Sequence, residues 1–349
     1  MAGNKVDWRA LWASGDLARF CFVSLGILLH ATNETMVATV MPAMVGELAG
    51  VQLVGWSLAI YELGAIVAGA AAGRLVSYVA LRSNMMVAAL LYAAGALICA
   101  VAPSMPFFLA GRLVEGLGGG ALVRPQAGSG TAPPFPYPAL ACLAIAVVLI
   151  AAAGIDIALL RSSLLLALGL IGLALFFRID ARRPRSRLFP APLFSWRSPL
   201  GSGMTMVAAF SVATCTFTIY GPLLLTTLHG IPILTTGYII AAESIAWSIL
   251  SILIANAPLE RERLIIVVGA LMIASGLAGF AYAIPAGSIP LILLCALLQG
   301  GGFGVCWPFL TRVIVASARD GEQTIASAAV PTMQRIGYAV GAALAGIVA

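Results

Sequence analysis

The chain has 349 residues, of which 61% are apolar and only 9% are charged, and its mean hydropathy is +1.05. In soluble domains about a quarter of the residues are charged, so this composition excludes a water-soluble globular protein. The formal net charge is +6, but the arginines lie in short segments between apolar runs, where the positive-inside rule explains them without a nucleic-acid partner.

Apolar runs of about 20 residues predict eleven membrane-spanning helices and an all-α, polytopic bundle. The expected spans are 18–42, 51–73, 84–102, 106–123, 138–158, 162–178, 199–224, 233–256, 263–283, 289–313 and 324–349. Residues 1–17 precede them as a juxtamembrane segment and lack the pattern of a cleavable signal.

The loops between these spans differ in charge by side. Nearly all basic residues fall in alternate loops, and the opposite loops hold almost none except Arg161. This asymmetry predicts a cytoplasmic N-terminus and places Val51, His229 and Ala286 outside. We therefore expect a multi-pass cell-membrane protein, in the inner membrane if the source is bacterial.

Two long loops divide the chain. Residues 124–137 are rich in Pro, Gly and Ser and form a predicted linker, and residues 179–198 form a basic cytoplasmic loop. Between them lies a hairpin, 138–178, which we expect at the periphery because it has no midspan charge. The predicted half-bundles are then 18–123, with four spans, and 199–349, with five.

Six charged side chains lie near the middle of predicted spans. They are Glu34, Glu62, Arg112, Glu115, Glu243 and Arg335. A carboxylate at the hydrocarbon centre costs roughly 2.5–3.5 kcal/mol on insertion scales, so such residues usually mark a functional site. Their number favours a transporter.

A proton site is predicted in the first half. His30 and Glu34 are one helical turn apart and share a face, with Asn33 beside them, and Arg112 and Glu115 are likewise one turn apart. The alternatives are an acid tied to a neighbouring helix for packing and a static Arg112–Glu115 pair. We favour a single proton-binding cluster.

A substrate site is predicted in the second half. Glu243 has Trp247 one turn later and Tyr238 about one turn before, and an acid among aromatic rings suits an organic cation. Glu62 belongs either to this substrate site, with Asn33, or to an ion pair with a basic group such as Arg335.

Five motifs in order along the chain resemble one known family, the fourteen-span drug:proton antiporter branch of the major facilitator superfamily. They are Thr32–Pro42 (TNETMVATVMP) with Val45–Leu48, Trp56–Tyr61 (WSLAIY), Gly73–Leu75 with Arg82, Arg112–Gly120 (RLVEGLGGG), and Gly302–Gly304 with Trp307-Pro308, Gln334–Gly337 and Gly341. The resemblance implies a major facilitator fold, a proton-coupled exchange of substrate, and modulation of a nearby acid by Arg112.

The chain also departs from this pattern. Asn33 with Glu34 replaces the family's first-span Asp, Glu115 replaces its fourth-span Gln, and Ser77 and Leu81 replace charged residues of the 2–3 loop. Two spans are missing between Val123 and Arg124, and so is the final span. The family's Gly-Pro antiporter signature, in the fifth span, is therefore absent.

The function expected is a secondary transporter, working as a monomer, that exports amphipathic, cationic small molecules in exchange for protons across the lipid bilayer. Two alternatives remain: a truncated, non-transporting scaffold or partner protein, and a narrower metabolite or siderophore exporter. No nucleophile–base arrangement or nucleotide loop indicates an enzyme. The six cysteines have no paired spacing, so no metal or cofactor is expected.

Overall fold

The structure, a computed structural model, describes residues 17–75, 81–122, 134–155, 158–184 and 186–348. Within its helices the description does not extend to the side chains of residues 17–31, 34, 72–75, 81–82, 122 and 348. The predicted N-terminal segment 1–17 and most of the predicted linker 124–137 therefore lie outside the described residues.

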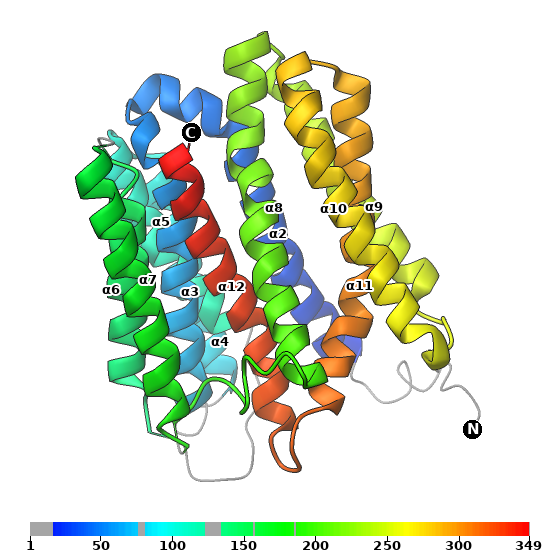
Figure 1. The fold of residues 1–349 in the computed structure, drawn as a ribbon. Helices are drawn as coiled ribbons and strands as arrows, with labels where there is room; N and C mark the ends of the chain where they lie inside the picture. Colours follow the sequence, from blue (N-terminus) through cyan, green and yellow to red (C-terminus); the bar gives the residue numbers. More distant parts are fainter. Residues whose placement is uncertain (1–16, 76–80, 123–133, 156–157, 185, 349) are drawn as a thin grey trace.

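The described residues form eleven α-helices and two short 3-10 turns, with no strand among them (Figure 1). The helices are α2 (Leu17–Leu48), α3 (Val54–Leu75), α4 (Leu81–Ala100), α5 (Met105–Leu122), α6 (Tyr137–Ala152), α7 (Leu159–Ala181), α8 (Pro199–His229), α9 (Ile233–Ile254), α10 (Glu262–Ala286), α11 (Ile289–Ala316) and α12 (Gln323–Val348). Seven stretches of the described chain are long and apolar enough to cross a membrane. The predicted all-α bundle of eleven spans is confirmed.

Glycine, proline and serine set several helix ends. The Ser198 hydroxyl accepts a hydrogen bond from the Gly201 N–H at 3.1 Å, capping the start of α8. Gly230 and Gly287 have φ angles of +62° and +64°, a conformation that glycine adopts readily, and they end α8 and α10. Short connections then return the chain antiparallel as α9 and α11.

Glycines bring α5 close to both α3 and α4. A Cβ atom on Gly116 would lie 2.1 Å from the carbonyl oxygen of Tyr61 in α3, and one on Gly118 would lie 2.4 Å from the backbone nitrogen of Tyr92 in α4. Small residues permit such close helix contact within a membrane. The RLVEGLGGG segment is therefore a packing surface that holds Arg112 and Glu115 in place.

The same arrangement recurs in α9, α10 and α11. A Cβ atom on Gly300 would lie 2.1 Å from the carbonyl oxygen of Glu243 in α9, and one on Gly302 would lie 2.7 Å from that of Gly269 in α10. Gly300 and Gly302 have the same two-residue spacing as Gly116 and Gly118, so α9–α11 repeat the packing of α3–α5.

Helices α2, α8 and α12 lie between these two triplets. Helix α12 packs against α3 and α8, and α2 packs against α8 and α9. Helices α6 and α7 form a hairpin at one edge of the bundle, where α6 also contacts α12 and α3 (Figure 1).

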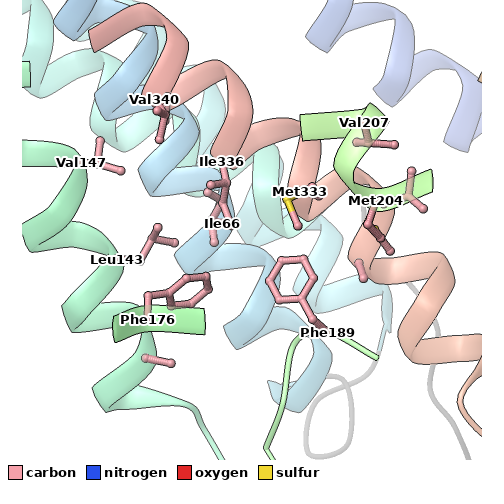
Figure 2. Close-up of a cluster of buried hydrophobic side chains, with 14 of the residues drawn as sticks. Ile66, Leu143, Val147, Phe176, Phe189, Met204, Val207, Met333, Ile336 and Val340 are labelled. Carbon is pink, nitrogen blue, oxygen red and sulfur yellow. The ribbon is translucent and has the colours of Figure 1, made fainter. Parts of the chain in front are cut away.

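One large apolar core joins this hairpin to the bundle (Figure 2). It includes Ile66 of α3, Leu143 of α6, Phe176 of α7, Met204 of α8 and Ile336 of α12. The loop between α7 and α8 contributes to the same core. Its Phe189 is buried there, and the Asp180 carboxylate accepts hydrogen bonds from the backbone N–H groups of Leu188 and Phe189 at 2.7 and 3.1 Å.

Candidate functional site

The centre of the first site is a buried ion pair in α5. Arg112 Nη1 donates to Glu115 Oε2 at 2.7 Å, and both side chains are almost fully buried. Arg112 Nε also donates to the Ser57 carbonyl oxygen at 3.4 Å, and its guanidinium lies 4.2 Å from the ring centre of Tyr61. The arginine thus has a carboxylate, a carbonyl and an aromatic face around it, the contacts that a buried cation needs.

Arg112 also lines a cavity of about 80 Å³ between the two parts of the chain that correspond to the predicted half-bundles, 18–123 and 199–349. The walls come from α2, α3 and α5 on one side and from α8 and α12 on the other. They comprise Val37, Ala38, Met41, Ser57, Leu58, Arg112, Cys215, Thr218, Ile219 and Tyr338. This volume holds several water molecules, whereas a drug-sized ligand needs roughly 300 Å³ or more. In this conformation the cavity is therefore too small for a drug-sized ligand.

A second ion pair joins the two parts directly. Arg335 Nη1 of α12 donates to Glu62 Oε2 of α3 at 2.8 Å, and the side chains are 12% and 2% exposed. Of the two possibilities raised for Glu62, this contact supports the ion pair with Arg335. Glu62 directly follows Tyr61, whose ring contacts Arg112, so the two ion pairs involve neighbouring residues of α3.

The second half contains a different carboxylate site. Gln299 Nε2 of α11 lies 2.6 Å from Glu243 Oε1 of α9. Gln299 is fully buried and Glu243 partly buried. The oxygen of the same amide, Gln299 Oε1, is buried and has no hydrogen-bond partner among the described residues.

Aromatic rings pack one turn beyond Glu243. Trp247 stacks on Phe303, with ring centres 5.0 Å apart and an interplanar angle of 17°, and its ring centre is 6.3 Å from that of Trp307. Phe210 of α8 completes the cluster against Phe303. The structure therefore places Trp247 inside the second half and close in sequence to Glu243.

The structure does not bring Tyr238 to the rest of this predicted site. Tyr238 is 66% exposed and lies on the same face of α9 as exposed aliphatic side chains. These are Leu234, Ile245, Ile249 and Ile252. At 3.6 residues per turn this face is opposite Glu243 and Trp247, so Tyr238 points outward with the apolar stripe.

The proposed Glu34–His30 contact lies outside the described side chains, so it stays a prediction. The neighbouring Asn33 is partly buried, and its Nδ2 atom is buried with no hydrogen-bond partner within the described part of the chain. Among the described residues, no group of three or more His, Cys, Asp or Glu side chains lies close enough to bind a metal ion.

Several residues at these sites were not identified from the sequence. Gln299 was missed although it is a polar residue inside an apolar run, directly before Gly300. Ser57 also lines the cavity and lies within the WSLAIY motif, whereas Cys215, Thr218 and Tyr338 line it without a sequence pattern that distinguishes them from other residues of membrane helices.

Comparison with protein families decides what kind of membrane protein has this arrangement. The family model of the Major Facilitator Superfamily matches residues 23–127 and 138–342. The chain belongs to the major facilitator superfamily. Members of this superfamily are transporters, so the expectation that the protein is not an enzyme is confirmed.

Relatives within the superfamily include transporters of several kinds. A Mycobacterium tuberculosis protein described as a probable multidrug-efflux transporter is 25% identical over 435 residues, which cover 99% of this chain and 90% of the relative. Vacuolar basic amino acid transporter 5 of Saccharomyces cerevisiae is 30% identical over 104 residues, covering 29% of this chain and 18% of that protein.

Solved structures show the same superfamily fold. A mutant of the nucleoside transporter NupG matches with a TM-score of 0.52 and 13% identity, over 90% of this chain and 86% of that one. The xylose transporter XylE of E. coli matches with a TM-score of 0.51 and 15% identity, over 93% and 95%.

The alignment with the Mycobacterium protein is longer than this chain. It extends over 435 residues, whereas the chain has 349, so the relative contains aligned segments that this chain lacks.

Proposed function

We propose that this protein is a secondary transporter that exports amphipathic cations in exchange for protons, by alternating access about the cavity between its two parts. The observation on which this rests is the fully buried Arg112–Glu115 pair, whose arginine lines that cavity. The name of the Mycobacterium relative supports a multidrug substrate range. The basic loops support a cytoplasmic N-terminus.

The proposed coupling depends on the distance between Arg112 and an acid. An arginine keeps its positive charge at all relevant pH values, so an acid near it and an acid apart from it bind protons differently. If the halves move between inward-open and outward-open states, Arg112 moves relative to acids of the neighbouring helices. Glu34 and His30 on α2, with Glu115 beside Arg112, are the proposed proton-binding partners.

The proposed substrate site is in the second half. Glu243 supplies a negative charge and Trp247 an aromatic face, which together attract an organic cation. Glu62 and Asn33 are further candidates for contact with substrate in the first half. The described structure contains no feature that specifically favours a scaffold role or a siderophore.

The test is transport by the complete chain in proteoliposomes with an imposed pH gradient and a fluorescent organic cation. Wild type should accumulate the cation against its gradient, whereas Glu34→Gln and Arg112→Ala should fall to the level of empty liposomes but still bind it. Because Arg112→Ala removes a large buried side chain, Glu115→Gln serves as a second, milder variant. Glu262→Gln, in the partly exposed Arg312–Glu262 pair, is the control and should transport normally. Uphill transport that survives in Glu34→Gln, Arg112→Ala and Glu115→Gln would refute the proposal.

A further inference from the structure

The two glycine-packed triplets place particular residues in equivalent positions. Gly116 faces Tyr61 and Gly300 faces Glu243, so Tyr61 in α3 corresponds to Glu243 in α9. The residues directly before these glycines, Glu115 and Gln299, correspond in the same way. Each half therefore has one carboxyl group at this packing level, on α5 in the first half and on α9 in the second.

The two carboxyl groups differ in what compensates their charge. Glu115 has Arg112 three residues before it, and the position three residues before Gln299 is Ala296, which is fully buried. Among the described side chains, the hydrogen-bond partner of Glu243 is the neutral Gln299. An ionised carboxylate without a cation is costly in such surroundings, and a bound proton removes that cost.

The geometry of the pair fits a protonated carboxyl. The 2.6 Å separation is within the usual range for O–H···O bonds, about 2.5–3.0 Å, and below that for N–H···O bonds, about 2.7–3.2 Å. Rotating the Gln299 amide by half a turn exchanges its oxygen and nitrogen within the same space. The amide oxygen then accepts a hydrogen bond from the carboxyl O–H, and Nε2 takes the buried position in which Oε1 has no hydrogen-bond partner among the described residues.

We infer that Glu243 and Gln299 form a proton-binding site in the second half of the transporter, separate from the Arg112 site. With the proton bound, the Glu243 O–H donates to the amide oxygen of Gln299. On release, the proton passes to water, the amide rotates, and Gln299 Nε2 donates to the carboxylate. Gln299 is thus a positioning residue that provides a hydrogen bond to either protonation state.

The surrounding helices contribute few other titratable groups. Helices α2, α8 and α11 pack against α9, and their described titratable side chains are Glu47, Cys215, Tyr220, His229, Cys295, Cys306 and Arg312. Arg312 is paired with Glu262, and His229 Nε2 is bonded to the Ile284 carbonyl. Glu34 of α2, whose side chain is not described, receives its own variant in the test.

One consequence of this site rests on the proposed function. An organic cation that binds at Glu243 replaces the proton as the positive charge that neutralises the carboxylate. Cation binding then releases one proton from the carboxyl group. Substrate and proton would therefore compete for a single carboxylate.

Infrared difference spectroscopy of the complete chain in nanodiscs, between acidic and alkaline pH, tests the proton site. One carbonyl band of a protonated carboxyl, assigned to Glu243, should be lost in Glu243→Gln and retained in Glu262→Gln and Glu34→Gln. In Gln299→Leu the band should remain but shift in frequency, because the O–H loses its acceptor. Identical carboxyl bands in wild type and Glu243→Gln would overturn the inference.

Adding tetraphenylphosphonium to weakly buffered protein tests the exchange. Proton release, followed with a pH indicator, should occur in wild type and disappear in Glu243→Gln. An unchanged release in that variant would overturn the exchange at Glu243. The infrared band does not depend on transport, so its outcome is distinct from a failure of the proposed function.

Discussion

The ion pair between Glu62 and Arg335 offers a quantitative test of how the two parts are held together. Removing one partner of a buried pair costs about 3–5 kcal/mol, because the other charge stays buried and uncompensated. Glu62 is 2% exposed and Arg335 is 12% exposed, so water reaches the arginine slightly. We expect Glu62→Gln to lower the free energy of unfolding by about 3 kcal/mol, the lower end of that range.

The Arg312–Glu262 pair is the matched control. It also joins two helices, α10 and α11, but its side chains are 38% and 24% exposed. Exposed pairs contribute about 0–1 kcal/mol, so Glu262→Gln should change the free energy of unfolding by no more than that.

Unfolding would be measured in mixed micelles with an increasing fraction of SDS, followed by tryptophan fluorescence and circular dichroism. Glu62→Gln, Arg335→Gln and the double variant form a cycle that isolates the pair from other effects of each change. If Glu62→Gln costs no more than Glu262→Gln, or if the two changes are additive, the pair does not hold α3 and α12 together and the reasoning from burial fails.

Three further predictions follow from the site. Glu243→Gln should weaken transport of cationic substrates more than of neutral ones, because it removes charge and keeps shape; an equal loss for both would assign Glu243 to folding or proton coupling alone. Tyr238→Leu should leave transport unchanged, whereas Trp247→Leu should reduce it by removing the stack on Phe303; comparable losses would show that Tyr238 belongs to the site. Gly300→Ala should lower the free energy of unfolding by about 1–3 kcal/mol, because its Cβ would be 2.1 Å from the Glu243 carbonyl oxygen. Gly46→Ala is the control and should not lower it, because the space around Gly46 is open. Equal unfolding midpoints for both variants would contradict the close approach of α9 and α11.

The helices could be predicted from the sequence because a membrane span needs a long apolar run, and such runs are visible without any contact information. The ends were less predictable. The first span was expected to end at Pro42, but α2 continues through Pro42 to Leu48. Likewise α8 continues beyond the expected end at Leu224 and stops at His229, before Gly230. Helices extend past the hydrocarbon layer, so hydropathy marks the span and not its termini.

The sites were predicted only in part because side-chain partners on other helices depend on packing. Arg112 and Glu115 are three residues apart on one helix, so their pairing follows from helical geometry. Glu243 and Gln299 are 56 residues apart, and only the contact of α9 with α11 brings them together. Tyr238 is five residues from Glu243, and at 3.6 residues per turn this spacing already puts the two side chains on different faces of α9.

The packing repeat also explains why the two halves need not perform the same chemistry. Glycines at equivalent positions fix the helix spacing in both triplets, and this leaves the neighbouring polar residues free to differ. In the first half Arg112 neutralises Glu115 within one helix. In the second half Gln299 contacts Glu243 but supplies no positive charge. Glu243 therefore needs a mobile positive charge, a proton or a cationic substrate, where Glu115 has the fixed charge of Arg112 in this conformation. A two-residue difference, arginine and glutamate against alanine and glutamine, is thus sufficient to give two equivalent positions of one repeated scaffold different compensation of a buried carboxyl group.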